Sequence, residues 1–156
     1  MRRVQYPKRD SPRRDSKKLK QLSDILKNIN RGNFSRLLFV YGLLKKSYNH
    51  NYPDLLMDEL QYICQASANG LLYDLGEFPA AFFDKNQSEV IHGEIYQLPK
   101  NSNHLSLLDE FEDVHASTPM YERIIISVQT DQGQIACWAY QYLGERNKPI
   151  IESGIF

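Results

Sequence analysis

The stretch from Tyr121 to Leu143 constrains the fold more than any other part of the chain. It holds two apolar segments, YERIIISVQT and IACWAYQYL, which flank the short polar segment DQGQ. β-Branched and aromatic residues favour extended strands, and a short connection that contains glycine joins antiparallel neighbours. The stretch therefore predicts an antiparallel β-hairpin.

Four earlier segments have the composition of strands, and one has the spacing of a helix. RLLFVYG predicts a buried strand that ends in a glycine turn, and PAAFFD predicts a short extended piece. LQYICQASANGLLYDLG predicts a strand or a bent hairpin with a turn signal at Asn69 and Gly70, and EVIHGEIYQL alternates as a strand does. Between the strands, SNHLSLLDEFED predicts a central helix. This order indicates an α+β domain whose sheet closes into a small mixed or antiparallel β-barrel with flanking helices.

Charge divides the chain, although its formal net charge is zero. Residues 1–36 carry 12 of the 19 basic and 3 of the 19 acidic residues, so this part holds +9 and the remainder −9. We therefore predict a basic, partly disordered extension over residues 1–33 and a folded domain over residues 34–156. Within the extension, leucine and isoleucine recur at helical spacing from Leu19 to Ile29.

Two interpretations of this amphipathic segment stand. It packs on the domain as a short helix, or it meets an acidic partner or an anionic surface as a basic helix. Nucleic acid is not the favoured partner, because the extension lacks interleaved aromatic residues. No apolar run reaches the roughly 18 residues that cross a membrane, and the N-terminus lacks the apolar core of a signal peptide. We therefore expect a cytoplasmic protein without a membrane span.

Most motifs that mark a cofactor or a nucleophile are missing from the sequence. The four histidines lie far apart without ligand spacing, so we expect no metal site. There is no glycine-rich loop for a dinucleotide or a phosphate, and no Gly-x-Ser-x-Gly turn that would support a serine triad. Cys64 and Cys137 lie in apolar segments and are expected to be buried free thiols.

The first candidate for chemistry is Glu112, in the stretch LSLLDEFEDV. At about 100° per residue on a helix, Glu112 falls between Leu105 and Leu108 on the apolar stripe. A lone acid there is commonly a boundary residue whose carboxylate reaches solvent. Alternatively, burial raises its pKa and makes it a usable base near neutral pH. Three other carboxylates of the stretch lie off the stripe: Asp109, Glu110 and Asp113.

The second candidate is VYGLLK, where the first predicted strand runs into Gly42. Main-chain N–H groups that are freed where a strand ends can bind an anion such as a carboxylate. An ordinary turn is the alternative interpretation, because strands often end in glycine.

Together these segments resemble the γ-glutamylcyclotransferase-like superfamily, in its γ-glutamylamine cyclotransferase or AIG2-like branch. VYGLLK resembles the family's Tyr-Gly-Ser/Thr-Leu opening, and LLDEFEDV resembles the helix that carries its catalytic glutamate. GLLYDLGEFPAAF, VIHGEIYQL, YERIIISV, CWAYQYLG and IIESGIF resemble further segments of the family. The motifs follow the family's order from about Leu37 to the C-terminus.

The resemblance implies a small β-barrel with a cavity at one end. It also implies an amide-cleaving cyclotransferase that converts a γ-glutamyl group to 5-oxoproline and releases an amine or amino acid, without metal or organic cofactor. Carried over residue by residue, Glu112 would be the general acid/base, and Tyr121 would line the pocket. The opening loop would hold the α-carboxylate of the small-molecule substrate: Tyr41, Gly42, Leu43 and Leu44.

Three segments depart from the family's pattern. Leu43 stands where serine or threonine is usual, and SGIF lacks the acid and tryptophan of the usual ending. The missing hydroxyl leaves open a non-catalytic module of the same fold that binds a small molecule, or a different amide or amine chemistry. Asp113 replaces the glycine that usually follows the glutamate, and it would raise the pKa of Glu112 if the carboxylates approach.

Overall fold

The computed structural model describes residues 36–42, 59–100 and 102–156. The predicted extension and its amphipathic segment lie outside these residues, as do Leu43 and Leu44, and the expected partner, location and domain boundary stay predictions. No helix within these ranges has the length and apolar character needed to span a membrane.

The elements in chain order are β1 (Leu37–Val40), β2 (Gln61–Asp74), β3 (Pro79–Phe83), β4 (Val90–Gln97), α3 (His104–Phe111), β5 (Tyr121–Thr130) and β6 (Gly133–Tyr142).

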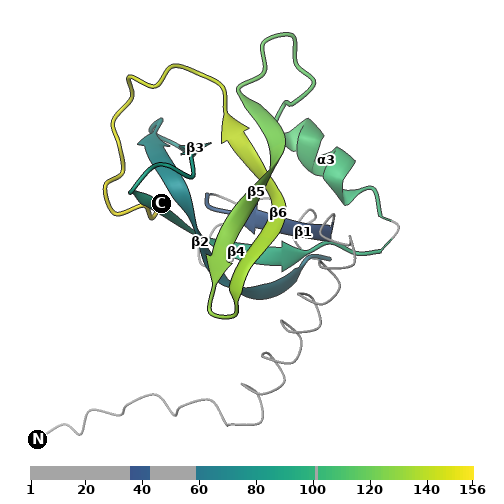
Figure 1. Cartoon of the computed structure of the whole chain (residues 1–156). Helices are drawn as coiled ribbons and strands as arrows, with labels where there is room; N and C mark the ends of the chain where they lie inside the picture. Colours follow the sequence, from purple (N-terminus) through teal and green to yellow (C-terminus); the bar gives the residue numbers. More distant parts are fainter. Residues whose placement is uncertain (1–35, 43–58, 101) are drawn as a thin grey trace, which may run out of the picture.

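Five of the strands close into a barrel (Figure 1). Neighbouring strands follow the order β2-β4-β1-β6-β5, and the pairing of Ser67 with Gln129 joins β5 back to β2. Strand β1 runs parallel to β6, with Leu38 opposite Trp138, and the other described pairs are antiparallel. Strand β3 pairs with β2 outside the closed ring. The predicted α+β barrel and the β5–β6 hairpin are confirmed.

Strand β2 is long because it changes its partner at Gly70. It pairs with β4 as far as Asn69 and with β3 from Gly70 onward. A Cβ atom at Gly70 would lie 2.3 Å from the carbonyl oxygen of Phe82, so the approach of β3 requires a glycine here. The predicted turn at Asn69 and Gly70 is therefore wrong. Glycine marks a close approach within one continuous strand.

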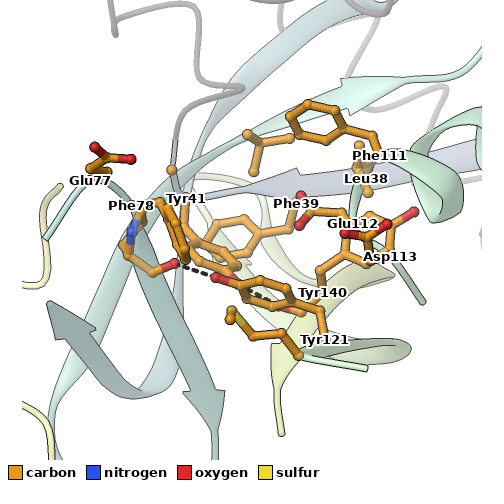
Figure 2. Close-up of a pocket in the computed structure, with 14 residues that line it drawn as sticks. Leu38, Phe39, Tyr41, Glu77, Phe78, Phe111, Glu112, Asp113, Tyr121 and Tyr140 are labelled. Carbon is orange, nitrogen blue, oxygen red and sulfur yellow. Dashed lines mark hydrogen bonds between the residues drawn. The ribbon is translucent and has the colours of Figure 1, made fainter. Parts of the chain in front are cut away.

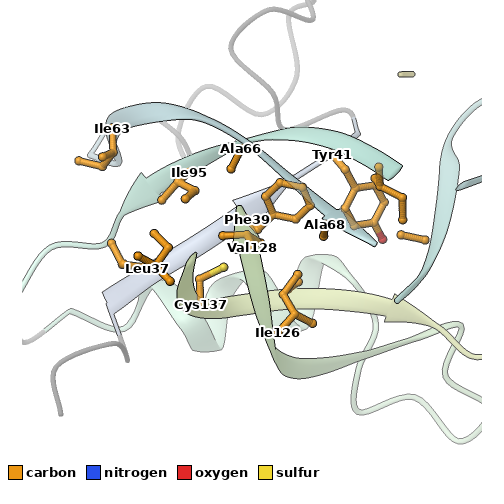
Figure 3. Close-up of a cluster of buried hydrophobic side chains, with 14 of the residues drawn as sticks. Leu37, Phe39, Tyr41, Ile63, Ala66, Ala68, Ile95, Ile126, Val128 and Cys137 are labelled. Carbon is orange, nitrogen blue, oxygen red and sulfur yellow. The ribbon is translucent and has the colours of Figure 1, made fainter. Parts of the chain in front are cut away.

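Alternate residues of the strands fill the interior of the barrel. Figure 3 shows Leu37 and Phe39 of β1 in this cluster together with Cys137 of β6. The other two side chains of β1, Leu38 and Val40, point to the opposite face and pack into a second cluster that includes residues of α3. Burial on both faces explains why the first strand is apolar without alternation. The predicted free thiols are present, with Cys137 buried and Cys64 half-buried.

Helix α3 packs on the outside of the barrel through Leu108 and a buried carboxylate. Asp109 is 5% exposed and accepts two hydrogen bonds from Arg123 of β5, Nε to Oδ1 at 2.8 Å and Nη2 to Oδ2 at 3.1 Å. The hydroxyl of Tyr140 in β6 donates a third, to Oδ1 at 2.8 Å. The prediction that Asp109 lies off the buried side is wrong, because a matching cation and hydroxyl on the barrel make its burial favourable.

The space around Gly93 of β4 gives a test of the packing. A Cβ atom there would lie 2.4 Å from the carbonyl oxygen of Val40 and 2.7 Å from the ring of Phe39. We expect Gly93→Ala to lower the free energy of unfolding by about 1–3 kcal/mol, because the backbone of β1 must shift. Urea denaturation measures this change. The exposed Ser127→Ala on β5 is the control, and equal stability of Gly93→Ala and wild type would contradict the described packing.

Candidate active site

A cavity of about 630 Å³ opens where strand β1 ends (Figure 2). Its walls are formed by the end of β1, the start of β3, the last turn of α3 and the start of β5, together with Tyr140 of β6. Most lining side chains are apolar or aromatic, and three carboxylates join them. Figure 2 shows Glu77 across the cavity from Glu112 and Asp113.

The structure brings the predicted site residues that it describes into one place. Tyr41, Gly42, Glu112 and Tyr121 all line this cavity. They come from the ends of β1 and α3 and from the start of β5, and the closed barrel brings the end of β1 next to the other two, which lie some 70 residues or more further along the chain.

Gly42 allows the end of β1 to approach the start of β3. A Cβ atom at Gly42 would lie 2.8 Å from the Cγ atom of Pro79, so a larger residue would push the two segments apart. The described pairing of β1 with β4 ends at Val40, which leaves the main chain of Tyr41 and Gly42 beyond the ladder and against the cavity. Main-chain groups beyond a strand end can serve an anionic ligand.

A tight C-terminal cap holds Glu112 in the cavity wall. Helix α3 ends at Phe111, and Glu112 is its C-cap residue. The N–H of Val114 donates to the Asp109 carbonyl at 3.0 Å, and the N–H of Asp113 donates to the Glu110 carbonyl at 3.1 Å. These two bonds, with Asp113 at φ 52°, form a Schellman motif. The cap fixes the backbone on both sides of Glu112.

The half-buried carboxyl of Glu112 titrates near neutral pH. Burial is the main cause that raises its pKa to about 7, and the negative charge of Asp113 adds to the effect. A carboxyl with such a pKa can accept and return a proton under physiological conditions.

Tyrosine hydroxyls surround Glu112, and each donates to a protein acceptor. Tyr41 donates to the main-chain carbonyl of Tyr140 at 2.5 Å. Tyr121 donates to the carbonyl of Pro79 at 2.9 Å, and Tyr140 donates to the buried carboxylate of α3. Burial raises the pKa of all three hydroxyls, and the charge of Glu112 contributes to each. They stay protonated at neutral pH and form fixed walls.

A comparison with protein families decides where the chain belongs. The profile described as gamma-glutamyl cyclotransferase, AIG2-like, matches residues 38–156. The chain belongs to this family. The resemblance inferred from the ordered motifs is confirmed, and the match spans every described element of the barrel except the first residue of β1.

Solved structures share the fold of this AIG2-like chain. YkqA from Bacillus subtilis aligns at 29% identity with a TM-score of 0.60, over 78% of this chain and 39% of that one. An AIG2-like protein from Mus musculus aligns at 22% identity with a TM-score of 0.61, over 75% and 86% of the two chains. A structure titled gamma-glutamyl cyclotransferase aligns at 22% identity with a TM-score of 0.54, over 74% and 70%. A comparison with curated proteins gave no significant match.

The cap of α3 gives a physical meaning to one departure from the AIG2-like pattern. Asp113 stands at the position where the family usually has glycine, and it has the left-handed conformation that glycine adopts without strain. Aspartate tolerates this conformation better than most residues. The cap is therefore kept, and a carboxylate is added to the cavity beside Glu112.

Two further residues of this region, Asp109 and Tyr140, are not among the predicted site residues. Tyr140 lines the cavity, and Asp109 fixes the helix from behind it. Both residues occur within quoted motifs, LLDEFEDV and CWAYQYLG. No local pattern links Asp109 to its partners, because Arg123 lies 14 residues and Tyr140 lies 31 residues further along the chain.

Replacing Asp113 tests the electrostatic effect on Glu112. We expect Asp113→Asn to lower the pKa of Glu112 below about 7, because a like charge is removed while asparagine still tolerates positive φ. A ¹³C NMR titration of the Glu112 carboxyl measures the change. Glu110→Gln, exposed on the same helix, is the control. A pKa that stays the same or rises in Asp113→Asn would contradict the coupling.

The raised pKa of Glu112 also predicts a pH-dependent cost in stability. The folded state retains a proton that the unfolded chain releases between about pH 4.5 and pH 7, so wild-type stability falls as the pH rises through this window. At pH 8, Glu112→Gln should be more stable than wild type, by at most about 3 kcal/mol. At pH 4 this advantage should vanish. Urea denaturation at both pH values measures it, and a difference independent of pH would be evidence against the buried charge.

Proposed function

We propose that this chain is a γ-glutamyl cyclotransferase, which converts a γ-glutamyl amide to 5-oxoproline and releases the amine or amino acid. The observation that carries the proposal is that the Glu112 carboxyl, with a pKa of about 7, lines the same cavity as the main chain of Tyr41 and Gly42. Membership of the gamma-glutamyl cyclotransferase, AIG2-like family supports the same chemistry.

Both polar groups on the α-carbon of the glutamyl unit have a partner in this proposal. The α-carboxylate binds the main chain at Tyr41 and Gly42, where N–H dipoles suit an anion. The chain of the glutamyl group lies along Tyr121 and the apolar wall, and the α-amino group faces Glu112. With the α-carbon held by these two contacts and the side chain confined by the apolar wall, the substrate can fold so that its nitrogen lies near its own γ-carbonyl carbon.

The reaction then needs one proton acceptor. The α-amino group is an ammonium at neutral pH, and the Glu112 carboxylate removes one proton to free the nitrogen lone pair. The nitrogen attacks the γ-carbonyl carbon, and a five-membered ring closes with a new C–N bond. The protonated Glu112 donates its proton to the departing nitrogen as the original amide C–N bond breaks. The second proton that the ring nitrogen must lose to become the lactam N–H passes through the regenerated Glu112 carboxylate to the released amine, which leaves as an ammonium. Ring closure within one held substrate supplies much of the rate enhancement.

The activity of Glu112→Gln tests the proposal. We expect its kcat for 5-oxoproline release from a panel of γ-glutamyl amides to fall by about 10²- to 10⁴-fold, because the amide side chain cannot accept the proton. In wild type, kcat/KM should rise with pH through a midpoint of about 7, where Glu112 loses its proton. Glu110→Gln serves as the matched control, since its carboxylate is exposed on the same helix.

Three results would oppose the proposal. Equal turnover by Glu112→Gln would remove the acid/base role. A wild-type acidic limb far below pH 7 would mean that another group governs the reaction. Thermal stabilisation by γ-glutamyl compounds without any 5-oxoproline would favour a non-catalytic binding module of the same fold.

A further inference from the structure

A line of buried polar contacts runs behind the cavity wall and connects α3 to the end of β1. Arg123 and Tyr140 both donate to the Asp109 carboxylate, and the main-chain carbonyl of Tyr140 accepts the hydroxyl hydrogen of Tyr41 at 2.5 Å. The line therefore crosses three strands and one helix. It ends at α3, which carries Glu112, and at Tyr41, whose main chain is proposed to bind the substrate.

Asp109 and Glu112 are linked through the geometry of one helical turn. They are three residues apart, so they lie on neighbouring positions of the same helix surface. The N–H of Glu112 donates to the carbonyl of Leu108 at 2.9 Å, and the carbonyl of Asp109 accepts the cap bond from Val114. A rotation of α3 that moved the Asp109 carboxylate away from Arg123 would also move Glu112 along the cavity wall.

Tyr140 is the connecting residue. Its hydroxyl reaches α3, while its carbonyl reaches Tyr41, the residue before Gly42. Its ring also lines the cavity, so it lies between the acid and the strand end (Figure 2). A shift of Tyr140 would therefore change the positions of both α3 and Tyr41.

We propose that Asp109 is a positioning residue, which through Tyr140 couples the placement of Glu112 to that of the main chain at Tyr41 and Gly42. This inference rests on the proposed function for its catalytic meaning. Asp109 does not line the cavity that would hold the substrate, so its contribution is to orientation. Its three accepted hydrogen bonds are charge-assisted, and the Arg123 pair is bidentate, which favours one fixed geometry.

Two substitutions test the coupling at different strengths. Tyr140→Phe removes one hydroxyl and retains the ion pair and the carbonyl, so it leaves the fold intact. Asp109→Asn retains the side-chain shape and removes the charge. If the line of contacts positions Glu112, each variant lets the last turn of α3 relax and the carboxyl gain water. The midpoint of the Glu112 titration should then fall from about 7 toward its ordinary value.

The measurement is a ¹³C NMR titration of the Glu112 carboxyl in the full chain, recorded together with the amide shift of Gly42. We expect Tyr140→Phe to move both signals and to lower kcat roughly three- to tenfold, the size expected for one hydrogen bond. Tyr73→Phe, buried in β2 outside the cavity lining, and Glu110→Gln on α3 should move neither signal.

A purely structural role predicts a different pattern. If Tyr140→Phe and Asp109→Asn lower the melting temperature but leave the Glu112 titration and the Gly42 amide unchanged, the coupling is overturned. The NMR readout needs no substrate, so it remains decisive even if wild type forms no 5-oxoproline from any γ-glutamyl amide. That last result would reject the proposed function and not the coupling.

Discussion

The partly buried ion pair between Asp109 and Arg123 ties α3 to the barrel in one orientation. The helix has eight residues, and a helix of this length is not stable in water without tertiary contacts. Leu108 supplies its apolar contact, and the pair supplies its orientation, since a buried carboxylate without its cation costs several kcal/mol. Arg123 also stacks on Trp138 at 4.4 Å from the ring centroid, which fixes the guanidinium from its other side. Because Glu112 is the C-cap residue of α3, its position in the cavity wall depends on this placement of the helix.

The region around Glu112 carries features that oppose stability. The half-buried carboxyl of Glu112 lies among tyrosines and has a raised pKa, a second carboxylate lies next to it, and a non-glycine residue has positive φ. Each of these features has an energetic cost, and all of them lie in the wall of one cavity. The barrel tolerates them because its interior is filled by alternate strand residues and because the cap satisfies the helix end. This distribution is typical of a protein in which a rigid scaffold supports a strained site.

Local sequence patterns were sufficient to predict most of the barrel. Strand β1 is apolar at every residue because both of its faces are buried, so its sequence alone predicts a buried strand. The two apolar segments of β5 and β6 are separated by a short turn, so their sequence predicts the hairpin. The single strand β2 could not be predicted with its pairing, because a glycine such as Gly70 occurs both in turns and within a strand where a paired neighbour approaches closely. The burial of Asp109 was also inaccessible, since helical periodicity counts a carboxylate as polar whatever partner lies 14 residues away. Glu112 was identified because it stands alone on an apolar stripe.

The central claim is that one cavity holds a proton-accepting carboxyl beside main-chain donors for an acid group. A crystal structure of wild type with bound 5-oxoproline tests it most directly. The account predicts that the product carboxylate contacts the main chain at Tyr41 and Gly42 and that a Glu112 oxygen lies about 3 Å from the ring nitrogen. A product molecule bound elsewhere, or a Glu112 side chain turned away from it into solvent, would contradict the account.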